Sequence, residues 1–339
     1  MSLEIHPEYM HRCIELAMKG AGTVAPNPMV GAVLVHGDRI IGEGYHRQYG
    51  QAHAEVECLA AVRPEDQHLI SGSTLYVSLE PCAHFGKTPP CADLIVRQHI
   101  PRVVVGCRDP FPQVDGRGIE KLQLAGIETI VGILERECRQ LNRRFFTFHE
   151  QRRPYIILKW AESANRAIAG AGGEPVKISH PLSDRLVHRW RSEEAAIAVG
   201  AKTVLKDNPS LTTRFWPGRN PVRVIFGGNT ALPTSARIFS EEARTIVFRG
   251  SESSLDHVLS VLWQENLQSL LVEGGTLLHE AFLTAGLWDE LRIITNERLV
   301  LQDGYPAPRW QGAYPFLEQR AGTDRIVYYH GTEDILPLY

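Results

Sequence analysis

The sequence predicts an α/β protein with two domains. With 339 residues, the chain is longer than a typical domain that folds around a single hydrophobic core. Short apolar strands alternate with amphipathic helices in both halves of the chain. A polar, basic stretch over residues 141–154 ends in a proline and separates the halves. We therefore expect one domain over 1–147 and a second over 148–339.

The first half is expected to form a three-layer α/β sandwich. Helical spacing of apolar side chains predicts a helix over 6–20. Apolar runs and periodicity then predict, in order, strands 30–35 and 39–45, helix 52–62, strand 74–79, helix 91–98, strand 102–107, helix 118–125 and strand 128–131. Strands that alternate with helices in this way are typical of a sheet covered on both faces.

A second α/β pattern follows the boundary. It comprises strand 155–160, helix 183–192, strand 195–199, helix 201–205, strands 222–226 and 245–248, helix 255–265, strand 269–273, helix 276–285 and strand 290–295. No G-x-G-x-x-G motif follows a strand, so a Rossmann dinucleotide fold is not expected. The two glycines after strand 269–273 precede a helix, which is one way to build a phosphate site.

Composition excludes several classes of protein. The net charge of −3 argues against a dedicated nucleic-acid binder, which usually carries a basic face. No apolar run reaches the roughly 18 residues of a membrane span, and the N-terminus lacks the pattern of a secretory signal. Six cysteines in a chain of 339 residues do not indicate a disulfide framework. We expect a cytoplasmic protein with reduced thiols.

Three short motifs predict a zinc site. His53 precedes Glu55 by two residues, and Cys82 and Cys91 each follow a proline. One imidazole and two thiolates supply three of the four tetrahedral positions of zinc and leave the fourth for water. Glu55 is then a carboxylate that moves protons rather than a ligand. This arrangement is the signature of zinc nucleobase deaminases.

The spacing within the motif leaves alternatives open. A closed, structural zinc site would need a fourth ligand, for which His84 is the nearest candidate. The segment between Cys82 and Cys91 is six residues longer than in the P-C-x-x-C motif of nucleic-acid-editing deaminases, and its His84 and Lys87 are candidate substrate contacts. The other four cysteines are expected to be ordinary buried residues: Cys13, Cys58, Cys107 and Cys138.

Motifs along nearly the whole chain resemble one enzyme family. They are PNPMVG at 26–31, HAE at 53–55, EPCAHFGKTPPC at 80–91, DP at 109–110, GRG at 116–118, KWAES at 159–163, RS at 191–192, DNPSLTTR at 207–214 and VEGG at 272–275. Together they resemble the bifunctional deaminase–reductases of riboflavin biosynthesis. The resemblance implies a cytidine-deaminase-like domain followed by a dihydrofolate-reductase-like domain.

The resemblance also implies two reactions and their cofactors. Zinc-dependent hydrolytic deamination of 2,5-diamino-6-(5-phosphoribosylamino)pyrimidin-4-one in the first domain would precede NADPH-dependent reduction of the ribosyl group to ribityl in the second. The partners implied are a small phosphorylated pyrimidine and further copies of the chain, as a homodimer or homotetramer, with neither nucleic acid nor membrane.

Family site residues can be placed on this sequence where the motifs match. His53, Cys82 and Cys91 would bind zinc, Glu55 would transfer protons and Asn27 would hold the pyrimidine edge. In the second half the substrate contacts would be Arg191, Leu211, Arg214 and Glu273, and the NADPH contacts Thr203, Asp207, Gly274, Gly275 and Thr276.

The reductase half departs from the family pattern at four positions. Asn165 and Arg166 replace a common Asp-Gly pair, and Pro175 and Lys177 replace a hydroxyl residue and an aromatic. Since arginine pays a steric penalty at positive φ, we expect the loop at 165–166 to follow another path. One alternative is therefore a deaminase with a weak or inactive reductase half. Others are a tRNA or nucleoside deaminase, a zinc-stabilised binding module, and a reductase that keeps its first domain as a scaffold.

Overall fold

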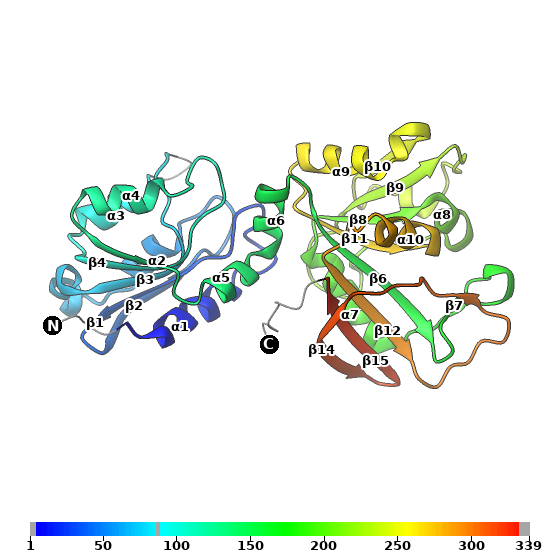
Figure 1. Cartoon of the computed structure of the whole chain (residues 1–339), viewed down its shortest axis with the longest axis horizontal. Coiled ribbons are helices and arrows are strands. Elements are labelled where there is room, and N and C mark those ends of the chain that lie inside the picture. Colours follow the sequence, from blue (N-terminus) through cyan, green and yellow to red (C-terminus); the bar gives the residue numbers. More distant parts are fainter. Residues whose placement is uncertain (1–4, 86–88, 332–339) are drawn as a thin grey trace. The chain divides into compact units, whose positions relative to one another are not determined.

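A computed structural model describes residues 5–85 and 89–331 of the chain (Figure 1). The chain folds into two compact units, of which the first ends at Glu150 and the second begins at Gln151. Both units are α/β, as the sequence predicts, and each is built around one sheet. Within the described residues, no helix combines the length and apolar character needed to cross a membrane.

The first unit contains a five-stranded sheet in the order β2-β1-β3-β4-β5. The strands are β1 (Gly31–His36), β2 (Arg39–Tyr45), β3 (Thr74–Leu79), β4 (Arg102–Cys107) and β5 (Glu128–Val131). β1 pairs antiparallel with β2 and β3, whereas β3, β4 and β5 run parallel. The carboxyl ends of β3 and β4 therefore lie at the same edge of the sheet.

Helices cover both faces of this sheet (Figure 1). They are α1 (Pro7–Met18), α2 (Ala54–Ala60), α3 (Cys91–Arg97), α4 (Arg117–Leu124), α5 (Glu135–Leu141) and α6 (Arg143–Gln151), with a 3-10 helix at Pro64–Gly72. Successive side chains of β1 alternate between two cores. Leu34 packs with Cys58 of α2 and Ile95 of α3, whereas Val33 packs with Ile14 of α1 and Leu141 of α5. The expected three-layer sandwich is confirmed.

Two helices occupy the stretch expected to be a polar connection. α5 and α6 extend over most of residues 135–151. Their apolar side chains are few but lie on buried faces: Cys138, Leu141, Phe145 and Phe146 all join the core of the first unit. The many charged residues between them conceal this periodicity in the sequence. The helix expected over 52–62 is shorter, Ala54–Ala60, because His53 is extended and serves as its N-cap.

The second unit contains an eight-stranded sheet in the order β10-β9-β8-β11-β6-β12-β15-β14. The strands are β6 (Tyr155–Ser163), β8 (Ala196–Gly200), β9 (Val222–Gly228), β10 (Thr245–Arg249), β11 (Ser269–Gly274), β12 (Glu290–Asn296), β14 (Tyr314–Ala321) and β15 (Asp324–His330). The six from β10 to β12 run parallel, and β15 and β14 continue antiparallel. Short strands β7 (Ala167–Ala169) and β13 (Tyr305–Pro306) pair separately.

Within the described residues, four helices cover the two faces of this larger sheet. They are α7 (Pro181–Glu193), α8 (Ala201–Asp207), α9 (Leu255–Gln264) and α10 (Thr276–Thr284), with short 3-10 turns at Ala171–Gly173, Arg237–Phe239 and Gly250–Ser253. Leu158 of β6 packs with Phe282 of α10, whereas its neighbour Ile157 packs with Val187 of α7. The β14–β15 hairpin was not among the expected elements. Pro315 and the charged residues in the second half of β14 obscure that strand, whereas β15 does contain an apolar run, over 326–329.

Candidate functional site

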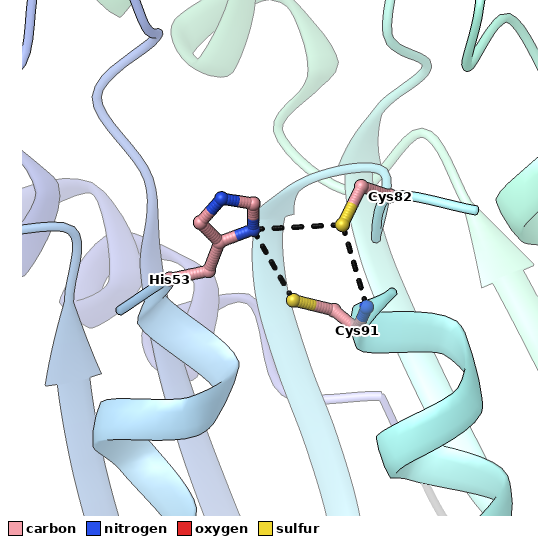
Figure 2. A group of neighbouring side chains, drawn as sticks. All are labelled: His53, Cys82 and Cys91. Carbon is pink, nitrogen blue, oxygen red and sulfur yellow. Dashed lines mark hydrogen bonds between the residues drawn. The ribbon is translucent and has the colours of Figure 1, made fainter. Parts of the chain in front are cut away.

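The three expected zinc ligands meet at one edge of the first sheet (Figure 2). His53 caps α2, Cys82 follows β3, and Cys91 is the first residue of α3. Nδ1 of His53 lies 3.5 Å from Sγ of Cys82 and 3.3 Å from Sγ of Cys91. The backbone N–H of Cys91 donates to Sγ of Cys82 at 3.3 Å. The fold thus brings one nitrogen and two sulfurs together, although His53 and Cys91 are 38 positions apart in the sequence.

The spacing of these atoms fits a tetrahedral zinc ion. Bonds of about 2.3 Å to sulfur and 2.0–2.1 Å to nitrogen, at a tetrahedral angle, separate the two ligand atoms by about 3.6 Å. The observed 3.3 and 3.5 Å are close to this value. The three ligand atoms lie within 4.8 Å of one another, and no other His, Cys, Asp or Glu joins the group in residues 5–85 and 89–331.

Local electrostatics favours the metal-binding form of Cys82. Hydrogen bonds with Cys91 and His53 outweigh burial and lower the pKa of Cys82 to about 4. The same contact with Cys82 raises the pKa of His53 to about 9. A thiolate is the form of cysteine that binds metal. Without an ion, the Cys82 thiolate is thus paired with the His53 ring, and zinc binding would displace protons from His53 and Cys91.

Glu55 lies on the first turn of α2, two residues beyond His53, and its side chain is buried. Burial raises the pKa of its carboxyl group, and the charges of His53 and Cys82 also act on it. The carboxyl group of Glu55 also interacts with the thiol of Cys91. A buried carboxyl with a raised pKa beside a metal centre is well suited to exchange protons.

Asn27 is held beside this centre by His46. Nδ2 of Asn27 lies 3.2 Å from Nε2 of His46, and Nδ1 of His46 lies 2.9 Å from the carbonyl oxygen of Ala52. A carbonyl only accepts, so Nδ1 carries the proton and Nε2 accepts from the Asn27 amide. The ring of His46 also packs edge-on against that of His53, with centroids 5.5 Å apart.

The segment between the two cysteines is described only in part. The ring of His84 lies 5.9 Å from that of Phe111, and Nδ1 of His84 is buried with no hydrogen-bond partner among the described residues. Phe85 is exposed. The predicted contact Lys87 lies outside the described residues.

A buried charge cluster lies at the carboxyl end of β11 in the second unit. Nε and a terminal nitrogen of Arg191 each donate to the carboxylate of Glu273 at 2.8 Å. Nζ of Lys159, on the neighbouring strand β6, is 3.6 Å from the same carboxylate. Burial opposes ionisation of Glu273, but Arg191 and Lys159 outweigh it and lower its pKa to about 2. Burial lowers the pKa of Lys159.

Lys159 and His188 were not among the expected site residues. His188 lies one helical turn before Arg191 on α7, and burial, followed by the charges of Arg191 and Arg214, lowers its pKa to about 4. A lysine within the otherwise apolar strand 155–160 was a signal for Lys159, whereas nothing in the sequence marked His188.

The expected cofactor residues Thr203, Gly274 and Gly275 come together. Oγ1 of Thr203 lies 3.2 Å from the position that a Cβ atom on Gly275 would occupy, and Gly274 has φ +149°. Gly275 caps α10, and Thr276 begins it. Glycines and a helix N-terminus at the carboxyl edge of a parallel sheet form a cradle that fits a phosphate group. Asp207 ends α8, the helix that carries Thr203.

Leu211 and Arg214 lie on the segment that follows α8. The carbonyl oxygen of Thr212 accepts from Arg191 at 3.0 Å, which joins this segment to the charge cluster. Leu211 is buried and has φ +52°, a conformation that costs a non-glycine residue about 1–2 kcal/mol. Such strain is concentrated at ligand sites. Arg214 is exposed and stacks over Phe215.

The loop at 165–166 does not avoid positive φ, so that expectation is wrong. Arg166 has φ +60°. Asn165 holds the turn, because its Oδ1 accepts from Ser163 and its Nδ2 donates to the carbonyl oxygen of Leu301 at 2.9 Å. An aspartate could not make the second bond. Lys177 pairs with Asp184.

The positive φ of Arg166 leads to a prediction about the stability of the protein. Arg166→Gly removes the steric cost of the left-handed conformation, about 1–2 kcal/mol. It also increases the conformational freedom of the unfolded chain, which lowers stability by about 0.5–1 kcal/mol. We expect the free energy of unfolding in urea to rise by up to about 1.5 kcal/mol, less the contribution of the long contacts of Arg166 with Glu162 and with the carbonyl oxygen of Pro308. Arg309→Gly is the control, since exposed Arg309 has no positive φ, and it should not stabilise. An equal gain in both variants would contradict the explanation.

Comparisons with known proteins agree with both units. The model of the cytidine and deoxycytidylate deaminase zinc-binding region matches residues 3–107, and that of the RibD C-terminal domain matches residues 154–300. The riboflavin biosynthesis protein RibD of Aquifex aeolicus is 40% identical over 321 residues, covering 88% of this chain and 89% of that protein. RibD of Escherichia coli is 35% identical over 328 residues, covering 87% and 88%.

Solved structures give the same result. A diaminohydroxyphosphoribosylaminopyrimidine deaminase/5-amino-6-(5-phosphoribosylamino)uracil reductase from Thermotoga maritima is 37% identical, with a TM-score of 0.84 and coverage of 96% and 98% of the two chains. RibD of Acinetobacter baumannii is 31% identical, with a TM-score of 0.87 and coverage of 96% and 99%.

Fold, site and comparisons define a two-domain enzyme in which a zinc-binding deaminase unit precedes a reductase unit. The chain belongs to the RibD family of riboflavin biosynthesis proteins. The expected fold class, a cytidine-deaminase-like sandwich followed by a dihydrofolate-reductase-like domain, is confirmed. No finding favours a deaminase whose second half is inactive.

Proposed function

We propose that His53, Cys82 and Cys91 hold the zinc ion of this deaminase and that Glu55 is its proton carrier. The observation that carries the proposal is the meeting of one nitrogen and two sulfurs within 4.8 Å, with the buried Glu55 carboxyl beside them. Three protein ligands rather than four are typical of a catalytic zinc site. Residues 1–147 would form the deaminase domain, and 148–339 the reductase domain.

The enzyme deaminates and then reduces a small pyrimidine of riboflavin biosynthesis, and the residues suggest how the first step proceeds. Zinc, when bound, lowers the pKa of a coordinated water. Glu55 accepts a proton from the attacking water and delivers it to the leaving amino group, which departs as ammonia. Asn27 would orient the pyrimidine through the amide oxygen that its bond to His46 leaves available. His84 and Lys87 would contact the substrate from the segment between the cysteines.

In the reductase half we propose that Glu273, Arg191, Leu211 and Arg214 bind the deaminated intermediate. NADPH supplies the hydride when bound. Gly274, Gly275 and Thr276 would receive a phosphate of the cofactor at the start of α10, with Thr203 and Asp207 beside it. Arg191 is fixed by two bonds to Glu273, so its remaining terminal nitrogen faces the segment that carries Leu211.

Two assays on the purified chain test this function. We expect ammonia release from the diaminopyrimidine phosphate without NADPH, and NADPH oxidation when the deaminated product is added. Removal of zinc with a chelator should stop the first reaction and leave the second. Ammonia release without any NADPH oxidation on the intermediate would contradict the reductase assignment, and full deamination after zinc removal would contradict the metal centre.

We propose that the protein is a homodimer or homotetramer. The proposal rests on the family resemblance, which implies assembly through the reductase half. Light scattering on the full-length chain should give two or four times the mass of one chain. A mass equal to one chain at micromolar concentration would contradict this proposal and leave the assignment of the two sites intact.

A further inference from the structure

Glu80 is a buried carboxylate beside the zinc ligands that the mechanism above does not use. Only Pro81 separates it from Cys82, and its side chain is almost inaccessible, with the residue 4% exposed. The backbone N–H of Glu80 donates to the carbonyl oxygen of Cys107 at 3.0 Å, so the chain leaves the sheet directly after it. A negative charge in such a place needs strong compensation.

Among the described residues, that compensation comes from backbone N–H groups. Oε2 of Glu80 accepts from Asp109 at 3.1 Å and from Gly116 at 3.0 Å. Oε1 accepts from Gly118 at 2.9 Å and from Ile119 at 3.2 Å. Gly118 and Ile119 lie in the first turn of α4, where a negative charge is favoured. All four partners are donors, and each carboxyl oxygen of Glu80 accepts from two of them.

The two glycines of the GRG motif allow this contact. A Cβ atom on Gly118 would lie 1.9 Å from the carbonyl oxygen of Pro81, so the start of α4 touches the residue between Glu80 and Cys82. Gly116 has φ +87°, a conformation that favours glycine. Segment 109–119 is therefore fastened to the segment that carries the zinc ligand.

Segment 109–119 also contributes to the surroundings of the site. The N–H of Phe111 donates to Oδ1 of Asp109 at 2.8 Å, next to the bond between Asp109 and Glu80. The Phe111 ring then packs against His84, a candidate substrate contact, with centroids 5.9 Å apart. One carboxylate thus connects the segment of a proposed zinc ligand with the segment that carries the aromatic contact of His84.

We propose that Glu80 is a positioning residue of the deaminase centre, which fixes Cys82 and segment 109–119 relative to each other through four backbone hydrogen bonds. The proposal rests on the proposed role of Cys82 as a zinc ligand. Residues that orient metal ligands affect metal affinity or activity by about 10- to 100-fold when they are replaced. Glu80 acts through these backbone groups.

The test compares zinc release from the full-length wild type and Glu80→Gln. The glutamine keeps the shape but places an NH₂ group against two N–H donors. We expect zinc transfer to a chromogenic chelator to accelerate about 10- to 100-fold, with a similar loss of ammonia release. NADPH oxidation on the deaminated intermediate should keep the wild-type rate. Asp66→Asn is the matched control, because Asp66 is also a buried carboxylate but pairs with Arg39 on β2, and it should release zinc like the wild type.

Glu80→Asp decides the question if the glutamine variant does not fold. Aspartate keeps the negative charge, but its shorter side chain brings the carboxylate less close to the four N–H groups. The rate of zinc release should therefore lie between that of the wild type and the roughly 10- to 100-fold faster rate expected for Glu80→Gln. Wild-type zinc release and ammonia release in a folded Glu80 variant would overturn the inference, as would a lower melting temperature without faster zinc release. If the wild type itself binds no zinc, the proposed ligands fail and the inference fails with them.

Discussion

Glu55→Gln is expected to lower ammonia release by about 10²- to 10⁴-fold, the usual contribution of a positioned acid or base. Glutamine fills the same space but cannot carry a proton between water and the leaving amino group. His53, Cys82 and Cys91 are unchanged, so zinc should remain bound in stoichiometric amount. The measurement is the rate of ammonia release together with the metal content of the same sample.

Glu57→Gln is the matched control for this prediction. Glu57 lies on the same helix but its carboxylate pairs with Arg47 at 2.9 Å instead of facing the zinc ligands. It should release ammonia at about the wild-type rate, and both variants should oxidise NADPH normally. Retained deamination in Glu55→Gln would contradict its role as proton carrier. Joint loss of zinc and folding would instead indicate a structural role.

Glu273→Gln is expected to destabilise the second unit and to stop NADPH oxidation. The Glu273 side chain is 7% exposed and compensates two buried cations, Arg191 and Lys159. Removal of one member of a buried pair leaves an uncompensated charge and typically costs about 3–5 kcal/mol. Urea unfolding at neutral pH, followed by a signal from the second unit, measures this cost. Ammonia release by the first unit should persist.

The same carboxylate predicts a pH dependence with a defined sign. The pKa of Glu273 is about 2 in the folded state, below the ordinary glutamate value of about 4.3. Its stabilising contribution is therefore present above pH 4.3 or so and is lost as the pH falls towards 2. Glu273→Gln should lack this part of the acid dependence. Glu265→Gln, which breaks an exposed pair with Arg244, should retain it. Identical acid profiles for Glu273→Gln and the wild type would contradict the assignment.

Much of the fold could be predicted from the sequence because its central strands are continuous apolar runs. The strands at Thr74–Leu79 and Arg102–Cys107 begin and end where expected, since their side chains are buried on both faces. The β14–β15 hairpin was not predicted, although β15 carries a largely buried apolar run over 326–329. Its outer strand, β14, contains Pro315, has no fully buried position and pairs with β15.

Ligand spacing in the sequence also indicated the zinc centre, because His53, Cys82 and Cys91 have side chains that bind metal. Glu80 could not be recognised in this way, since its partners are backbone N–H groups that every residue type except proline provides. At Arg166, by contrast, the sequence led to a clear expectation that was wrong. A steric rule argued against positive φ at this position, but the hydrogen bonds of Asn165 hold the turn in that conformation.

The place of β6 in the second sheet has a consequence for synthesis on the ribosome. This first strand of its unit, Tyr155–Ser163, pairs with β11 and β12, more than a hundred residues further along the chain. Its hydrogen-bonding edges thus stay open until residues 269–296 have emerged. In the first unit, by contrast, β1 already finds β2 across a tight turn. The first unit can therefore fold while the second is still being synthesised. The incomplete second unit exposes unpaired strand edges for longer, so it is the part of the nascent chain more prone to aggregation.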